Sequence, residues 1–218
     1  MGKLILIRHG HTPLNSHGKE ERLRSWLDVP LDEQGLQEAV EIAQKVSAFP
    51  VSAIYSSDLK RARQTAEMVR QTTKASVNTT EELRPWNLGI FGGQLLREII
   101  PFLNLLNESP GLPAPNGESF HQFYARYSRR LTEMLSLAEQ SRGCVVVVTH
   151  VRNLLAARSI IEHGDRDRVP VQGGPPTGTL TVVEKVNGAW KMQGCESQPA
   201  LLRSSDSLGF GERDALAS

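Results

Sequence analysis

Two histidines in this chain each follow a short run of apolar residues. Residues 4–7 are Leu, Ile, Leu and Ile, and Arg8, His9 and Gly10 come directly after them. Residues 145–148 are four valines, which are followed by Thr149 and His150. Apolar runs of this length that are rich in β-branched residues predict buried strands. Because open α/β sheets bind ligands at the carboxyl ends of their strands, we expect both histidines at one site.

These residue types suit phosphoryl transfer. A neutral histidine can attack phosphorus when an acceptor holds its second ring nitrogen. We expect Nδ1 of His9 to donate to a backbone carbonyl, which leaves Nε2 free to attack. Arg8 and Arg61 would supply forked donors that match phosphate oxygens, and His150 would donate to the same group. Arg61 lies at the start of a predicted helix, whose amide dipole also favours an anion.

Strands and helices are predicted to alternate along most of the chain. We expect strands at residues 4–7, 54–55, 76–79 and 144–149, and helices from about 32 to 46 and at 59–71, 119–139 and 151–162. A hairpin is expected across 178–186 and 189–195, turning at Asn187 and Gly188. This alternation predicts an α/β fold, a three-layer sandwich with a mostly parallel central sheet and helices on both faces.

Two local details of the first two helices can also be predicted. The spacing of apolar residues favours one buried face on the first helix, made of Leu36, Ala39, Val40 and Ala43. Cap-type residues stand before the second helix, namely Ser56, Ser57 and Asp58.

The length of 218 residues is sufficient for one well-buried domain, which we place at residues 1–197. Residues 83–117 are rich in glycine and proline, which is typical of an active-site excursion, and a short helix is expected near 95–107. Residues 198–218 are polar, with scattered serine and glycine, and are expected to form a loose C-terminal tail.

The charge balance argues against several classes of partner. The chain has 25 basic and 24 acidic residues, a net charge of +1, so we expect no nucleic-acid partner. No apolar run approaches the ~20 residues of a membrane span, so we expect no membrane partner. Cys144 and Cys195 lack the spacing of a redox pair and are expected to be reduced thiols. The expectation is a cytoplasmic protein with a small phosphorylated substrate, and a homodimer is left open.

Several sequence blocks together resemble the histidine phosphatase superfamily, in its phosphoglycerate-mutase-like branch. They recur in the family's order across residues 4–160. The blocks are Leu6-Ile7-Arg8-His9-Gly10-His11-Thr12 with Asn15, Ser56-Ser57-Asp58-Leu59 with Arg61-Ala62 and Thr65-Ala66, Leu83-Arg84 with Gly89, Gly117-Glu118-Ser119 with Arg126, and Val148-Thr149-His150.

The resemblance implies roles for particular residues. His9 would be the phosphorylated nucleophile, Arg8, Arg61 and His150 its phosphate pocket, and Asn15 a residue that shapes or contacts that pocket. It also implies no metal and no organic cofactor. Beside these residues we place His11 at the edge of the pocket, the Val151 amide on the phosphate and Trp86 in the wall of the cleft.

Two of three departures from the family pattern carry most weight, and the third, His11 where the family usually has glutamate, carries little. The family often carries glycine after its second histidine, whereas this chain has Val151 and Arg152, and Arg152 adds a charge near the pocket. Pro85 stands where the family has its proton-donating glutamate, and proline has no proton to give. We therefore expect Glu118 or Glu82 to donate the proton. Glu118 is preferred because glycine at 117 lets the backbone bend toward the pocket.

The function expected from the sequence is a metal-independent phosphomonoesterase that acts on a small phosphorylated metabolite through a phosphohistidine at His9. A phosphoglycerate-type mutase is one alternative, because it would use the same nucleophile. A non-catalytic phospho-ligand-binding or sensor protein is the other, and the loss of the usual acid at Pro85 favours it.

Overall fold

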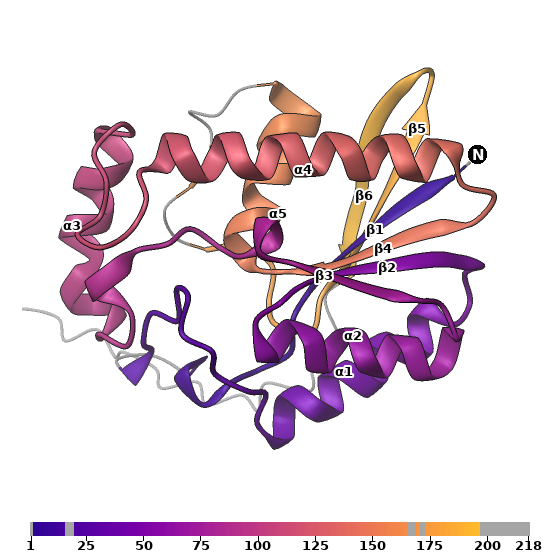
Figure 1. Ribbon diagram of the computed structural model, residues 1–218, viewed down its shortest axis with the longest axis horizontal. Helices are drawn as coiled ribbons and strands as arrows, with labels where there is room; N and C mark the ends of the chain where they lie inside the picture. The colour runs from indigo at the N-terminus through magenta and orange to yellow at the C-terminus, as the bar shows by residue number, and fades with distance from the viewer. Residues whose placement is uncertain (1, 16–19, 165–168, 171–172, 197–218) are drawn as a thin grey trace, which may run out of the picture.

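A six-stranded sheet forms the centre of the fold (Figure 1). The computed structural model describes residues 2–15, 20–164, 169–170 and 173–196. The strands are β1 (Lys3–Arg8), β2 (Val51–Ser57), β3 (Val77–Thr80), β4 (Cys144–Thr149), β5 (Leu180–Val186) and β6 (Ala189–Glu196). Their order is β3-β2-β4-β1-β5-β6. The first four are parallel, and β5 and β6 add an antiparallel hairpin beside β1.

Helices cover both faces of this sheet (Figure 1). α1 (Glu33–Val46) and α2 (Lys60–Thr73) cover one face, α4 (Phe120–Gln140) and α5 (Val151–Arg158) cover the other, and α3 (Leu96–Glu108) lies away from the sheet. Alternate residues of β1 enter different cores: Leu4 and Leu6 pack with α4 and α5, whereas Ile5 and Ile7 pack with α1 and α2. This alternation follows from the two-residue period of a strand. The predicted three-layer α/β sandwich is confirmed.

The predicted hairpin between β5 and β6 is also confirmed. Asn187 and Gly188 have φ angles of 52° and 82°. Two successive positive φ angles are typical of the tight turn that matches the twist of antiparallel strands. α3 corresponds to the short helix that we expected within residues 83–117. The predicted tail at 198–218 lies outside the described residues.

The predicted buried face of α1 is partly wrong. Leu36 and Val40 are 41% and 39% exposed, whereas Ala39 and Ala43 are buried. Polar contacts explain why α1 is turned about its axis relative to the predicted buried face. The carboxylate of Glu38 is buried and accepts the His11 backbone N–H at 2.8 Å. The helix therefore directs Glu38 inward rather than Leu36 and Val40.

The predicted cap of α2 is wrong as well. Ser56 and Ser57 are the last two residues of β2, and both are fully buried. Leu59 occupies the cap position and makes no side-chain cap hydrogen bond. Asp58 instead forms an ion pair with Arg84 at 2.5 Å. The Asp58 carboxylate therefore links the start of α2 to the segment after β3, and it does not cap α2.

Candidate active site

The register of β1 against β4 brings the two strand-end histidines together. These strands are parallel, and Arg8 pairs with Thr149, so His9 and His150 follow at the same edge of the sheet. The backbone N–H of His9 donates to the Thr149 carbonyl at 3.0 Å. The two imidazole rings lie edge to face with their centroids 5.0 Å apart, and both residues are 2% exposed.

The hydrogen bonds of His9 fix which ring nitrogen carries the proton. Nδ1 of His9 lies 2.7 Å from the carbonyl oxygen of Gly10. Because a carbonyl can only accept, Nδ1 must donate, and the neutral ring keeps its lone pair on Nε2. Burial, followed by the charges of Arg61 and Arg8, holds the pKa of His9 well below its usual value. His9 is therefore neutral at pH 7, with Nε2 available as a nucleophile.

Arg61 is held beside His9 by the first turn of α2. Its Nε lies 3.3 Å from Nε2 of His9. Its other two guanidinium nitrogens donate to the backbone carbonyls of Leu27 at 2.7 Å and Ser25 at 2.9 Å. The side chain is buried, and burial together with the charge of Arg24 lowers the pKa of Arg61 to about 9. It remains a cation at neutral pH and is joined to Nε2 of His9 by one hydrogen bond.

His150 has free hydrogen-bonding capacity inside the site. Both of its ring nitrogens are buried, and neither has a hydrogen-bond partner among the described residues. Burial is the main cause that lowers the pKa of His150, followed by the charges of Arg61 and His9. Buried polar atoms are normally satisfied. A site that leaves both nitrogens open is thus suited to a polar ligand.

These groups surround a small cavity of about 80 Å³, which we name the phosphate pocket. Its lining residues are His9, Leu23, Arg24, Ser25, Arg61, Pro85, Trp86, Leu88, His150, Val151 and Arg152. A larger cavity of about 350 Å³, the outer chamber, shares four of these residues and adjoins it. The shared residues are Leu23, Arg24, Val151 and Arg152. The two cavities together can hold a small anionic molecule.

The residues expected to bind phosphate divide between these cavities. His9, Arg61 and His150 line the phosphate pocket, whereas Arg8 lines the outer chamber. Arg8 is buried, and its Nη1 donates to the Pro175 carbonyl at 2.5 Å. Burial lowers the pKa of Arg8 to about 10, so it stays charged.

Only half of the expected substrate-binding residues line a cavity. Val151 and Trp86 line the phosphate pocket, and their binding roles stay predictions. His11 instead contacts Asp32 through Nδ1 at 2.6 Å. The side-chain carbonyl of Asn15 accepts from the Thr12 backbone N–H at 3.0 Å. These two residues contact the loop after β1 rather than the pocket.

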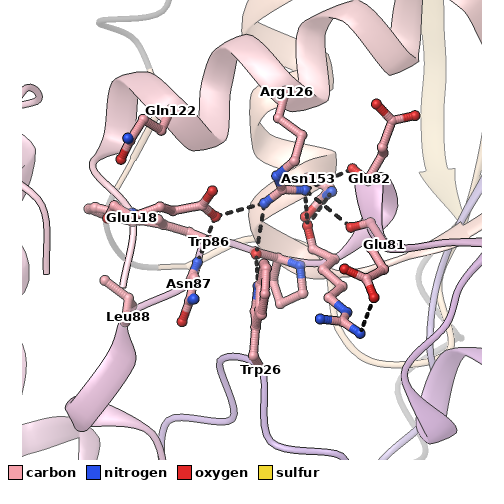
Figure 2. Close-up of polar contacts among 12 residues, drawn as sticks. Trp26, Glu81, Glu82, Trp86, Asn87, Leu88, Glu118, Gln122, Arg126 and Asn153 are labelled. Atoms are coloured by element: carbon pink, nitrogen blue, oxygen red, sulfur yellow. Dashed lines mark hydrogen bonds and ion pairs between the residues drawn. The ribbon is translucent and has the colours of Figure 1, made fainter. Parts of the chain in front are cut away.

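The two glutamates expected to donate a proton lie elsewhere. Figure 2 shows Glu118 turned toward Arg126 and the backbone of Asn87. Its Oε1 accepts from Arg126 Nη2 at 2.7 Å and from the Asn87 N–H at 2.9 Å. Glu82 forms an ion pair with Arg129 on the surface of α4. Neither carboxylate lines the phosphate pocket or the outer chamber.

Arg126 and Glu118 hold the wall of the pocket in place. Arg126 donates to the backbone carbonyls of Glu82 at 2.8 Å, Arg84 at 3.1 Å and Pro85 at 3.3 Å (Figure 2). The indole N–H of Trp86 donates to the Glu118 carbonyl at 3.0 Å. These contacts fix the segment that carries Pro85 and Trp86 to the start of α4.

Sequence reasoning overlooked Glu21, Arg24 and Ser25. Arg24 lines both cavities, and its Nη1 donates to the Leu14 carbonyl at 3.1 Å. Glu21 lines the outer chamber and forms an ion pair with Arg24 at 3.4 Å. The only available signal was the polar character of residues 11–34, which does not distinguish pocket residues from solvated ones.

Two features are absent from the described part of the chain. No group of three or more histidine, cysteine, aspartate or glutamate residues there is arranged to hold a metal ion. Within the same residues, no helix combines the length and the apolar character that crossing a membrane requires.

Known proteins are similar to this chain in sequence and in fold. The sequence is 32% identical over 155 residues to the probable phosphoglycerate mutase GpmB of Proteus mirabilis, covering 67% of this chain and 69% of the relative. The fold is similar to the structure titled "Mycobacterial hydrolase 1", with a TM-score of 0.75, 25% identity and coverage of 89% of this chain and 98% of that one.

A mycobacterial glucosyl-3-phosphoglycerate phosphatase solved with inorganic phosphate is also similar. Its TM-score is 0.73 at 25% identity, over 89% of this chain and 96% of that one. The sequence profile of the histidine phosphatase superfamily (branch 1) matches residues 4–197. With most of its length matched, this chain belongs to the histidine phosphatase superfamily.

Proposed function

We propose that this chain hydrolyses phosphate monoesters of small metabolites through a phosphohistidine at His9. The observation that carries the proposal is the hydrogen bond from Nδ1 of His9 to the Gly10 carbonyl. It leaves the Nε2 lone pair facing Arg61, in a pocket where both ring nitrogens of His150 have no partner among the described residues. A nucleophilic nitrogen of His9, the cation of Arg61 and the available ring nitrogens of His150 thus share one small cavity.

The reaction would proceed in two steps. Nε2 of His9 forms a bond to phosphorus while the bond from phosphorus to the leaving oxygen breaks. Arg61 and His150 stabilise the charge on the phosphoryl oxygens, since donors fixed in advance act most strongly where charge develops. Arg8, at the neighbouring chamber, adds a second positive charge to that of Arg61. Water then attacks phosphorus, the bond to His9 breaks, and inorganic phosphate leaves.

The leaving oxygen needs a proton unless it is a good leaving group. No described residue lining the phosphate pocket carries a carboxyl group, and Pro85 forms part of its wall. We therefore propose water as the proton source, and we expect activated aryl esters to react faster than alkyl esters.

The dimensions of the site support a small-molecule substrate. The phosphate pocket has about 80 Å³ and the outer chamber about 350 Å³. Pockets of a few hundred cubic ångströms are typical of small-molecule sites.

A phosphoglycerate mutase is the second candidate, because curated relatives carry that name. A mutase must protect its phosphohistidine from water and return the phosphoryl group to a second substrate. The proposals differ in products: a phosphatase releases inorganic phosphate, whereas a mutase interconverts 2- and 3-phosphoglycerate.

The test uses p-nitrophenyl phosphate, 2- and 3-phosphoglycerate and glycerol 3-phosphate, each with and without EDTA. We expect phosphate release and an acid-labile phosphoenzyme, both abolished in His9→Ala. His163→Ala, which changes an exposed histidine, is the matched control.

Isomerisation without phosphate release would support the mutase. A His9→Ala protein that keeps more than about a tenth of the wild-type rate would refute covalent catalysis at His9. Binding of phosphate esters without turnover would indicate a sensor.

A further inference from the structure

Ser25 has a strained backbone conformation in the wall of the phosphate pocket. Its φ angle is 43°, in the left-handed region that residues other than glycine, asparagine and aspartate seldom adopt. The residue is buried and lines the cavity together with His9. Left-handed residues of this kind persist where the surrounding contacts impose the conformation, and they are common at functional sites. The contacts of Ser25 must therefore compensate for its backbone strain.

The hydroxyl group of Ser25 contacts two backbone groups of residues 86–88. Its Oγ accepts the Leu88 N–H at 2.9 Å and donates to the Trp86 carbonyl at 3.4 Å. Leu88 and Trp86 are buried, and both line the same pocket as Ser25. A buried N–H or carbonyl group that lacks a partner is costly. One hydroxyl group thus satisfies a buried donor and a buried acceptor in the pocket wall.

Trp26, the next residue, contacts the same segment. Its indole N–H donates to the Pro85 carbonyl at 2.8 Å (Figure 2), and the Arg84 guanidinium lies 4.5 Å from the centre of the indole ring. Adjacent side chains of an extended chain point in opposite directions. Because the chain is left-handed at Ser25, two successive side chains can both reach residues 84–88. The strained conformation therefore directs Ser25 and Trp26 onto one wall of the pocket.

Arg61 connects Ser25 to His9. Nη2 of Arg61 donates to the Ser25 carbonyl at 2.9 Å, and its Nε lies 3.3 Å from Nε2 of His9. Hydrogen bonds thus run without interruption from His9 through Arg61 and Ser25 to residues 86–88. This chain joins the end of β1, the first turn of α2, the loop before α1 and the segment after β3.

We infer that Ser25 is a positioning residue, whose hydroxyl group fixes residues 86–88 relative to His9 and Arg61. The left-handed backbone at Ser25 lowers the stability of the fold and is retained because it directs the hydroxyl group to this wall. The inference rests on the proposed function, because the reaction at His9 requires the pocket to be held in shape. Groups that are fixed in advance lower a reaction barrier only while their geometry is maintained.

Three substitutions separate the hydroxyl group from the backbone conformation. Ser25→Gly removes the hydroxyl group and adopts a positive φ without strain, whereas Ser25→Ala removes the hydroxyl group and keeps the strain. Ser25→Thr keeps a hydroxyl group, but its β-branched side chain is less favourable at positive φ. We therefore expect Ser25→Gly to have a higher Tm than Ser25→Ala, and Ser25→Thr to have a lower Tm than Ser25→Gly.

Activity should follow the hydroxyl group rather than the stability. Well below the lowest Tm, kcat/KM for p-nitrophenyl phosphate should fall by about tenfold in both Ser25→Gly and Ser25→Ala, which corresponds to the loss of one hydrogen bond. Ser25→Thr should keep at least about a third of the wild-type value. The less stable threonine variant would then be more active than the more stable glycine variant, which a merely structural role does not predict.

Lys74→Gly is the matched control for relief of backbone strain. Lys74 has a φ angle of 61°, is exposed and follows the last residue of α2, whereas Arg61 lies in the first turn of that helix. Lys74→Gly should raise Tm and leave kcat/KM unchanged. Full activity in both Ser25→Ala and Ser25→Gly, or activity that is higher in Ser25→Gly in step with its Tm, would overturn the inference. This comparison holds even if Ser25→Thr does not fold.

The inference and the proposed function can fail separately. If wild-type protein hydrolyses p-nitrophenyl phosphate and the alanine and glycine variants match it, the proposed function stands and the positioning role is wrong. If wild-type protein hydrolyses no ester, the proposed function is wrong, and calorimetric titration with inorganic phosphate tests the positioning role instead. Phosphate should then bind at least about threefold more weakly to Ser25→Ala and Ser25→Gly, and unchanged binding would overturn the inference.

Discussion

Nε of Arg61 lies 3.3 Å from Nε2 of His9, while the other two nitrogens of the same guanidinium hold the carbonyls of Ser25 and Leu27. One side chain therefore connects His9, which directly follows β1, to the loop before α1. Ser25 is also a lining residue of the phosphate pocket. Arg61 thus places a positive charge beside His9 and also fixes part of the wall of the pocket.

The first prediction separates Arg61 from its neighbour Arg63. Arg61→Ala should lower kcat/KM for p-nitrophenyl phosphate by about 100-fold or more, because it removes a preorganised charged donor. It should also lower Tm, because the carbonyls of Ser25 and Leu27 lose their donors. Arg63 is exposed on the same helix, and Arg63→Ala should change stability by no more than about 0.5 kcal/mol. If both variants keep full activity, Arg61 does not contact the phosphoryl group.

The second prediction concerns stability in acid. The pKa values of His9 and His150 are lowered in the folded state, so below about pH 6.5 the unfolded chain binds protons that the folded chain excludes. The free energy of unfolding should therefore fall as pH drops through this range, by about 1.4 kcal/mol per pH unit for each histidine. Above this range neither histidine should contribute to the pH dependence of the free energy of unfolding.

Urea unfolding between pH 7.5 and 5 measures this slope. His150→Gln should reduce the slope by about one proton. His163→Gln changes an exposed histidine and is the control. An unchanged slope in His150→Gln would show that His150 takes up its proton in the folded protein.

The relation between sequence and structure is closest at the sheet. The apolar runs before His9 and His150 predicted two strands, and parallel pairing of Arg8 with Thr149 places the two histidines side by side. This was possible because short continuous runs of β-branched apolar residues are typical of strands that are buried on both faces. The edge of the sheet and its two histidines could therefore be predicted from local pattern.

The walls of the cavity could not be predicted in this way. Arg24 and Glu21 lie in a segment without helical or strand periodicity, and its path depends on distant contacts such as that of Arg61 with the Ser25 carbonyl. The rotation of α1 depends on Glu38, whose carboxylate binds the backbone of His11. Such long-range polar contacts leave no periodic signal in the sequence.

The third prediction treats Glu118 as a positioning residue. Its carboxylate holds Arg126 and the Asn87 N–H, and these contacts fix the segment with Pro85 and Trp86. Glu118→Ala should lower stability by about 1–3 kcal/mol, because it removes hydrogen bonds to a charged group that is largely buried. Aryl and alkyl phosphates should then be slowed by the same factor.

The control for Glu118 is Glu82→Ala, which breaks a surface ion pair with Arg129 and should cost no more than about 1 kcal/mol. A proton donor would behave differently from a positioning residue. If Glu118→Ala slows alkyl phosphates far more than p-nitrophenyl phosphate, Glu118 reaches the leaving oxygen during turnover.

The last prediction adds the missing acid. Pro85 lines the phosphate pocket, and its carbonyl, which accepts from the Trp26 indole at 2.8 Å, is retained in any substitution. Pro85→Glu would place a carboxyl group at the wall beside His9. A general acid contributes roughly 10²–10⁴-fold, mainly for leaving groups that cannot depart as anions. We therefore expect Pro85→Glu to accelerate glycerol 3-phosphate hydrolysis by at least about tenfold and p-nitrophenyl phosphate hydrolysis by much less.

Pro85→Gln is the control for the change in the backbone, because the glutamine side chain has nearly the same shape as that of glutamate but no acidic proton. If the glutamine variant accelerates alkyl esters equally, the gain comes from loop geometry. If neither variant does, protonation of the leaving group does not limit the rate in this protein.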